Sequence, residues 1–129
     1  MNHHEYAEQC AYVQWFRTQY PKYAEALMAN MAGQQLSGTK LQRQIKVGRE
    51  KKAGFKSGVS DIQIAVPNHT YHGLWIEFKA PGKDFSFVKQ NQRDHMNLMN
   101  ALGYHATWVN SSDKAIAITK EYMRGVNIL

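Results

Sequence analysis

The pattern of apolar and polar residues predicts a helix at the start of the chain and an ambiguous element after it. Apolar residues are spread along residues 5–20 at spacings that fit a helix, and Pro21 ends the segment. Residues 22–33 contain alanine, leucine and methionine, which favour helix. Residues 26–31, followed by Gly33, could instead form a short strand. Both interpretations are open at this point.

A second helix is predicted from Thr39, which can act as its N-cap, to about Lys52. Gly54 and Gly58 then interrupt the regular pattern. Three apolar residues along this helix are expected to face the interior of the protein: Leu41, Ile45 and Val47.

Two consecutive strands are predicted in the middle of the chain. Residues 62–66 are rich in β-branched residues, and a turn region begins at Pro67. Residues 74–79 form the second strand, which we expect to run antiparallel to the first and to end before Pro81. The pair therefore has the form of a hairpin with a long connection.

The last part of the chain predicts a helix, a strand and a helix. Residues 86–102 carry apolar side chains at helical spacing, and Gly103 suits the position after a helix. Residues 104–109 are predicted as a third strand and residues 112–123 as a final helix. This order of elements predicts an α/β fold with helices flanking a small mixed sheet.

Three ionisable residues are predicted to meet where the two middle strands pair. Because side chains alternate along a strand, Glu77 and Lys79 share one face with Trp75. The apolar residues between them share the other face, which is expected to pack on a helix. Asp61 begins the neighbouring strand, so a hairpin would place it beside Glu77 and Lys79.

Such a cluster suits a divalent cation. Two carboxylates in contact raise each other's pKa, and an ion that takes both as ligands relieves the repulsion. Mg²⁺ accepts few protein oxygens and keeps water molecules, one of which can become a nucleophile. Lys79 could orient that water or neutralise charge on a phosphate. Taken singly, Asp61 could also be an ordinary turn residue, and Glu77 and Lys79 a solvated pair.

The composition fits a single folded domain over residues 1–129 with a polyanionic partner. Of its 129 residues 43% are hydrophobic, and no apolar run is long enough to span a membrane. The chain has one cysteine, so no internal disulfide can form, and no secretion signal is visible, which favours the cytoplasm. The net charge of +6 favours polyanions.

Basic residues are concentrated directly before Asp61. The stretch contains Lys40, Arg43, Lys46, Arg49, Lys51, Lys52 and Lys56. A phosphate backbone could follow these charges to the acidic cluster. Alternatively, they form a solvated helix face without a partner.

The ordered motifs resemble those of the VRR-NUC family, a branch of the PD-(D/E)xK nuclease superfamily. The resemblance covers most of the chain. The matching segments are Glu5-x-x-x-Gln9 with Trp15, residues 54–62, residues 73–79, residues 86–92, and Gly103-Tyr104 with the closing helix. Ser60 departs from the superfamily pattern, which has proline before the aspartate.

The resemblance implies a restriction-endonuclease-like core that cuts DNA phosphodiester bonds with Mg²⁺ or Mn²⁺. It assigns Asp61 and Glu77 as metal ligands and Lys79 as the catalytic lysine. Gln92 corresponds to the glutamine that follows the Glu-x-Lys motif.

The resemblance also implies that a glutamate on the first helix completes the site. Glu5 matches by its distance from Gln9, and Glu8 is the rival for this catalytic and metal-binding place. Helical geometry does not separate them, because residues three apart lie on nearly one face. The family pattern further favours a strand over residues 26–31.

Stand-alone members of the family resemble Holliday-junction resolvases. The resemblance therefore implies a structure-specific endonuclease for DNA repair, bacterial or phage-encoded, that acts on branched DNA as a homodimer with two-fold symmetry. Two alternatives are open: a flap, nicking or phage-associated nuclease of other specificity, and a non-catalytic DNA-binding module of the same fold.

Overall fold

The computed structural model describes residues 2–30 and 38–129. Within this part of the chain, helices and strands alternate much as the sequence predicts. The elements are α1 (His3–Gln19), η1 (Pro21–Ala26), β1 (Leu27–Ala29), α2 (Lys40–Lys52), β2 (Ile62–Ile64), β3 (Leu74–Phe78), η2 (Phe85–Phe87), α3 (Gln90–Ala101), β4 (His105–Val109) and α4 (Ser112–Met123).

The strands form one mixed sheet in the order β1-β2-β3-β4. β1 pairs with β2 and β2 with β3 in antiparallel fashion, whereas β3 and β4 are parallel. In the central pair, Ile62 lies opposite Ile76 and Ile64 opposite Leu74. The predicted α/β class and the antiparallel pairing of the two middle strands are both confirmed.

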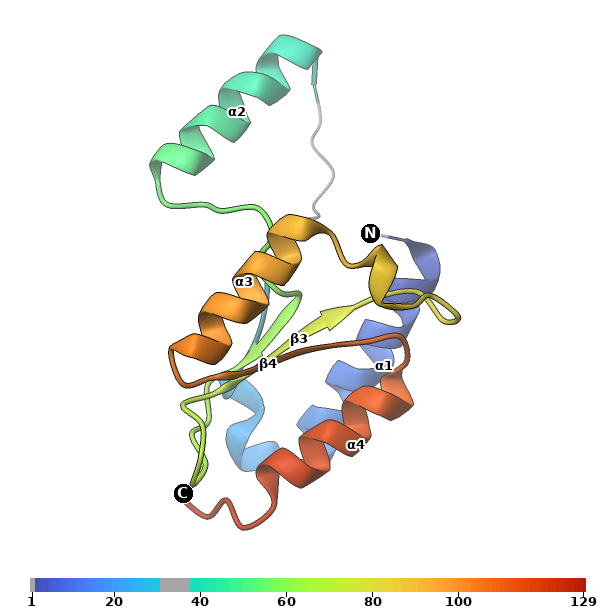
Figure 1. Cartoon of the computed structure of the whole chain (residues 1–129), viewed down its shortest axis with the longest axis vertical. Coiled ribbons are helices and arrows are strands. Elements are labelled where there is room, and N and C mark those ends of the chain that lie inside the picture. The colour runs from blue at the N-terminus through green and yellow to red at the C-terminus, as the bar shows by residue number, and fades with distance from the viewer. Residues whose placement is uncertain (1, 31–37) are drawn as a thin grey trace.

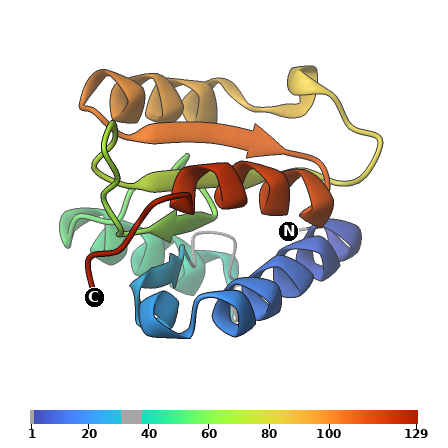
Figure 2. The ribbon, with the colours of Figure 1, turned by 90° about the horizontal axis from the view of Figure 1, so that it is seen from below.

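Helices cover both faces of this sheet, as Figure 2 shows, with α1 and α4 on one side and α3 on the other. The apolar side chains of β3, namely Leu74, Ile76 and Phe78, are fully buried in the core cluster that includes residues of α1 and α4. A buried hydrogen bond of 2.7 Å between the hydroxyls of Tyr12 and Thr119 joins these two helices.

The opposite face of the sheet carries a smaller apolar cluster beneath α3. Val88, Met96 and Ala106 are buried there, and Trp75 packs against them. Trp75 alternates with the fully buried side chains of β3, so the two faces separate as the strand period predicts. Glu77 and Lys79 consequently emerge on the α3 side.

The predicted strand over residues 26–31 is confirmed in its centre, where β1 spans Leu27–Ala29. A 3₁₀ helix, Pro21–Ala26, precedes it. Met31 and Gly33 lie outside the described residues. Pairing with β2 decides this segment, because Leu27 and Ala29 find partners in Ile64 and Ile62.

The helix predicted from residue 86 begins later, at Gln90. Residues 85–87 form a 3₁₀ turn, in which Asp84 accepts a hydrogen bond of 2.9 Å from the backbone N–H of Ser86. Val88 is extended and buried, so its apolar character reflects the smaller cluster and not the first turn of a helix.

The second predicted helix is present, but its orientation prediction was wrong. α2 begins after Thr39, whose hydroxyl accepts from the N–H of Gln42 while the Gln42 side chain accepts from the N–H of Thr39. None of its residues is buried; Leu41 is 65% and Ile45 47% exposed, and Val47 is half-buried. Figure 1 shows α2 standing away from the rest of the molecule. Apolar residues on a helix mark a face that can be covered, but they do not supply the covering element.

The described helices include none with the length and apolar character needed to cross a lipid bilayer.

Candidate active site

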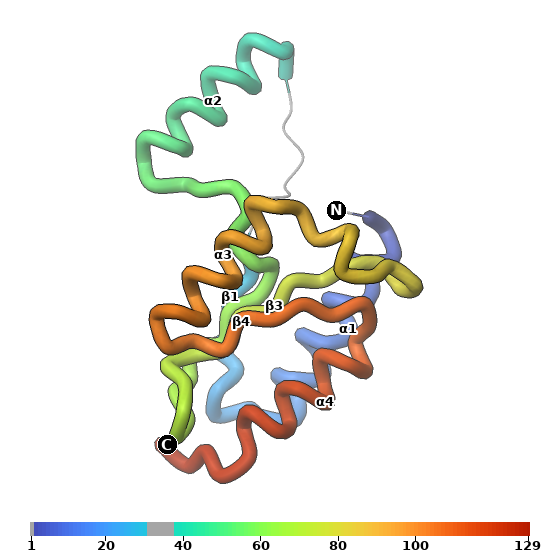
Figure 3. The backbone as a smooth tube through the Cα atoms, viewed as in Figure 1, coloured from blue at the N-terminus to red at the C-terminus, as the bar shows by residue number. Residues whose placement is uncertain are grey.

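The predicted ionisable residues converge at one end of the sheet. The start of α1, the end of β3 and the start of α3 lie together there, with the C-terminus at the opposite end (Figure 3). Since Ile62 pairs with Ile76, Asp61 comes beside Glu77 one position further along. The Asp61 Oδ2 atom accepts a hydrogen bond of 2.7 Å from the backbone N–H of Phe78. This bond fixes the aspartate at the end of β3.

A chain of short contacts links Glu77, Gln92 and Lys79. The Gln92 Nε2 atom donates to Glu77 Oε1 at 2.7 Å, and the Lys79 Nζ atom donates to Gln92 Oε1 at 2.9 Å. Lys79 Nζ also lies 3.5 Å from Glu77 Oε1. Gln92 Oε1 additionally accepts from the backbone N–H of Lys89 at 2.9 Å, which anchors the glutamine to the first turn of α3. The glutamine therefore holds the carboxylate and the ammonium in a fixed arrangement.

These residues line a cavity of about 510 Å³. Its walls come from α1, the loop before β2, β3, the η2 region and α3, and they include Glu5, Asp61, Glu77, Lys79, Lys83, Phe87, Lys89 and Gln92. A larger cavity of about 650 Å³ lies between residues 68–71 and α4. It contains no predicted site residue, so we place the candidate active site in the smaller one, where charged groups converge.

Asp61 is held in surroundings that disfavour its charge. Burial raises the pKa of Asp61 to about 6, while the hydrogen bond from Phe78 and the charge of Lys79 act in the opposite direction. The carboxylate of Glu5 adds to the increase, which shows that it lies close enough to interact with Asp61.

The surroundings of Glu77 disfavour its ionised form more strongly than those of Asp61 do. Burial raises the pKa of Glu77 to about 8, and the neighbouring Asp61 carboxylate contributes to the increase, while Lys79 opposes it. Glu77 is only 3% exposed, and its Oε2 atom is buried without a hydrogen-bond partner among the described residues. A buried carboxylate oxygen with no partner is a place where a proton or a cation is expected.

Glu5 and Glu8, the two rival glutamates of α1, lie in different surroundings. Glu5 lines the cavity, whereas Glu8 does not, and Glu8 Oε2 accepts a hydrogen bond of 2.6 Å from the backbone N–H of Ser112. Glu8 thus sits at the N-terminus of α4, where a negative charge is favourable. This contact engages Glu8 away from the cavity, whereas Glu5 lines the cavity together with Asp61.

The loop before Asp61 is packed tightly against α3. Gly58 has a φ of +86°, and a Cβ atom built there would lie 2.8 Å from the backbone oxygen of Asn91. Ser60 is 1% exposed, and its hydroxyl lies 3.4 Å from Nδ1 of the buried His95. The Ser60 hydroxyl therefore links the loop to α3, a contact that proline could not make.

Several cavity residues were not predicted from the sequence as parts of the site. Asn2, which precedes α1, and Asn91 of α3 line the cavity. His95 supports the loop from behind, and burial lowers its pKa. No local pattern marks these residues as parts of a site, because the packing of α1 and α3 against the sheet brings them there.

The carboxylates are too few to enclose a metal ion by themselves. Over residues 2–30 and 38–129, no group of three His, Cys, Asp or Glu side chains is gathered closely enough to hold an ion. Asp61 and Glu77 are adjacent, and Glu5 lines the same cavity. This donor set suits a cation that takes one or two carboxylates and completes its shell with water or substrate oxygens, as Mg²⁺ does.

Comparison of the sequence with protein-family models and with curated proteins gave no match. Comparison of the structure with solved structures did. The fold matches a structure described as "VRR_NUC domain protein" with a TM-score of 0.76 and 21% sequence identity, over 96% of this chain and 91% of the other. The predicted restriction-endonuclease-like arrangement of a mixed sheet flanked by helices is thereby confirmed.

Proposed function

We propose that this chain is a VRR-NUC nuclease that hydrolyses phosphodiester bonds in DNA with the help of a divalent metal ion. One observation carries the proposal: the buried Glu77 and the half-buried Asp61 lie side by side, with Lys79 and Gln92 in contact with Glu77, in a cavity that Lys83 and Lys89 also line. The surroundings of these carboxylates disfavour the ionised form, so a metal ion that balances their charge would bind favourably there. The lysines of the same cavity suit a phosphate.

The residues present fit such an ion. The unpartnered Glu77 Oε2 and the carboxylate of Asp61 would hold it, and Glu5 would complete the protein ligands directly or through water. All three supply hard oxygen atoms, which select Mg²⁺ or Mn²⁺ over softer metals. When bound, the ion would supply an activated water molecule and polarise the scissile phosphate.

The other residues of the cavity have separable roles. Lys79 would place its ammonium group against a phosphate oxygen and stabilise the negative charge that grows there during hydrolysis. Gln92 positions Lys79 and Glu77 relative to each other through its two hydrogen bonds. Lys83 and Lys89 would hold flanking phosphates at the mouth of the cavity.

Branched DNA is the proposed substrate, and a homodimer the proposed active form. The support is the likeness to a structure described as a VRR_NUC domain protein. A four-way junction has two-fold symmetry, and a dimer with the same symmetry would present two cavities to it.

A cleavage assay across DNA structures tests the proposal. Wild-type protein should cut a four-way junction in Mg²⁺ or Mn²⁺ much faster than linear duplex, and EDTA should abolish cutting. Lys79→Ala should lose cleavage and keep binding, whereas Lys120→Ala, which removes an exposed lysine of α4, should behave as wild type.

The same assay separates the alternatives. Faster cutting of flaps or nicked duplex would keep the nuclease and replace the junction as its substrate. Tight binding without cleavage in any metal, unaffected by Lys79→Ala, would identify a non-catalytic DNA-binding module. Sedimentation with and without junction DNA tests the dimer independently.

A further inference from the structure

The charge of this protein is concentrated in a single helix. α2 carries six basic residues and one acidic residue, Glu50, within its 13 residues. The remainder of the chain carries ten basic and nine acidic residues, so it is almost neutral. The net charge of +6 therefore resides nearly completely in α2.

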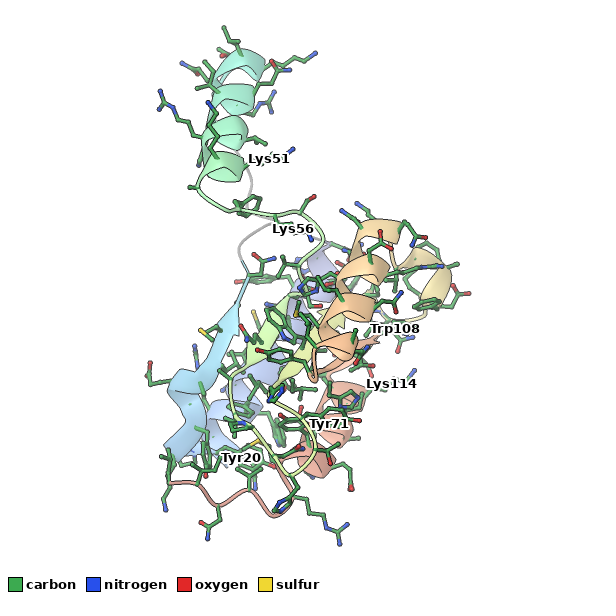
Figure 4. All side chains as sticks on the ribbon, turned by 60° about the vertical axis from the view of Figure 1, so that its left-hand side comes forward. Tyr20, Lys51, Lys56, Tyr71, Trp108 and Lys114 are labelled. Carbon is green, nitrogen blue, oxygen red and sulfur yellow. The ribbon has the colours of Figure 1, made fainter. Side chains whose placement is uncertain are left out.

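These charges are not used inside the protein. Two ion pairs are found among the described residues, Lys79 with Glu77 and Arg124 with Glu121, and neither involves α2. None of the helix residues is buried. Figure 4 shows side chains leaving α2 on several sides, with Lys51 at its end and Lys56 on the segment that leads back to the body. The helix is thus a projecting, positively charged arm.

The arm is nevertheless a well-formed helix. Thr39 and Gln42 form a capping box at its start, and Ala53 donates a hydrogen bond to the carbonyl of Arg49 at its end. Basic residues in its last turn interact favourably with the helix dipole. A helix that is stabilised locally, without a core, is available as a preformed binding element.

The cations surround the helix axis. Residues nine apart are separated by two and a half turns and project in opposite directions. Arg43 and Lys52 form one such pair, and Lys40 and Arg49 form another. A helix with cations on opposite sides can bind between two negatively charged surfaces, one on each side of it. The two phosphate backbones that border a DNA groove have this arrangement.

The dimensions agree with this partner. A helix with side chains is about 10–12 Å in diameter, and the major groove of B-DNA is about 12 Å wide. The 13 residues of α2 span about 20 Å, close to six base-pair steps. The exposed Leu41 and Ile45 would then contact apolar base edges such as thymine methyl groups. Two copies of α2 would repel each other, which argues against this helix as a dimer contact.

We propose that α2 inserts into the major groove of a DNA duplex. It would hold that duplex while a strand of the same DNA enters the cavity. The proposal rests on the proposed function only in taking DNA as the partner. Eight residues connect Lys52 with Asp61, and four of them, Phe55, Ser57, Gly58 and Val59, line the cavity. The grip on the duplex and the site of cleavage are therefore joined by one short segment.

Metal-free binding of a fluorescent linear DNA duplex over a range of salt concentrations tests the proposal. The α2 variant is Arg43→Gln with Lys46→Gln and Arg49→Gln. The control variant is Lys22→Gln with Lys114→Gln and Lys120→Gln, which lowers the net charge equally at exposed positions outside α2. The α2 variant should bind about tenfold or more weakly and lower the salt slope by up to about 2.7, because each phosphate contact contributes about 0.9. The control should stay close to wild type.

Two further probes examine the groove itself. Wild-type protein should prefer duplex DNA over duplex RNA, whose major groove is deep and narrow, and the α2 variant should lose this preference. Equal weakening by both triple variants would reduce the effect to net charge and overturn the proposal. Equal loss of single-stranded and duplex binding by the α2 variant would overturn insertion into a groove.

Folding of the α2 variant is measured separately from its DNA binding. The substituted side chains are exposed, so circular dichroism and the melting temperature should be unchanged. If helix content falls, Lys40→Gln with Lys51→Gln and Lys52→Gln provides a second variant on the same helix. Because binding is measured without metal, normal binding by the α2 variant refutes the role of α2 even if the protein cleaves. Binding through α2 without cleavage refutes the nuclease alone.

Discussion

The cavity and α2 place their charges in opposite surroundings. In the cavity, Glu77 is buried and Asp61 is half-buried, and the pKa values of both rise because loss of hydration disfavours the ionised forms. On α2, six cations stand in solvent, unpaired with any carboxylate of the described residues. Buried charges act at contact distance on a bound ion or proton, whereas exposed charges act over about a Debye length and weaken with salt.

This difference suggests separate roles: the cavity for the reaction and α2 for electrostatic binding of the partner. The cavity is rigid, since Asp61, Glu77, Lys79 and Gln92 are tied to β3 and α3 by hydrogen bonds. Within residues 2–30 and 38–129, no side-chain hydrogen bond or ion pair ties the arm to the sheet or to another helix, and the arm depends on its own caps. Substitutions in the cavity should therefore affect the reaction, and substitutions in the arm should affect binding and its dependence on salt.

The largest effect is expected from Glu77→Gln. The amide keeps the shape and removes the charge, so cleavage should fall about a hundred- to thousandfold. The metal-free protein should become more stable, because the buried carboxylate that opposes folding is gone. Cleavage rates and melting temperatures check both expectations, with Glu25→Gln, an exposed carboxylate outside the cavity, as the matched control. Retention of full activity in Glu77→Gln would remove this carboxylate from the reaction.

A dependence of stability on pH should follow from the same carboxylates. Unfolded carboxyl groups have pKa values of about 4, and those of Asp61 and Glu77 in the folded protein are about 6 and about 8. Between these values the folded state binds more protons than the unfolded state, so stability falls as pH rises. The melting temperature in EDTA should therefore decrease between pH 5 and pH 9 by several degrees or more, because each unit of pKa difference is worth about 1.4 kcal/mol.

Mg²⁺ should reverse this trend, because an ion that binds only the folded state adds stability. Its effect should be larger at pH 8.5 than at pH 5, where protons compete for the same oxygens. Thermal scans of wild type and Glu77→Gln with and without Mg²⁺ measure it. A flat profile in EDTA for the wild type would show that the carboxylates do not titrate as their burial requires.

A moderate effect is expected from Gln92→Ala. This change removes the bridge between Lys79 and Glu77, and we expect about a tenfold loss of cleavage with little change in DNA affinity. Gln90→Ala on the same helix removes an exposed side chain that donates a hydrogen bond to Asp94, and it serves as the control. Comparable losses in the two variants would point to α3 stability in place of positioning.

The smallest effect is expected for Ile45→Ala in α2. Its side chain is 47% exposed, so the free energy of unfolding should change by no more than about 0.5 kcal/mol. Ile64→Ala, at a fully buried position of β2, should cost about 2–5 kcal/mol. Chemical denaturation compares the two, and a large loss for Ile45→Ala would mean that α2 packs on the core in solution.

Local chemistry determined most of the secondary structure in advance. Thr39 caps α2, Gly103 follows α3 with a positive φ, and the alternation along β3 separates the buried Ile76 and Phe78 from Glu77. Such features depend on neighbours within a few residues, which the sequence contains. The start of α3 was predicted too early, because an apolar residue such as Val88 fits the pattern of a buried helix face as well as that of a buried extended segment.

The candidate site residues could be named from their types and spacing in the chain: two carboxylates, a lysine and a glutamine, on elements that pair or pack. Which glutamate of α1 lies in the same cavity depends on tertiary packing, because Ser112 of α4, distant in sequence, engages Glu8, whereas Glu5 lines the cavity. Tertiary packing also decided that Leu41 and Ile45 remain exposed. The physical reason is the same in both cases: a helix face is defined by local spacing, but what covers it comes from elsewhere in the chain.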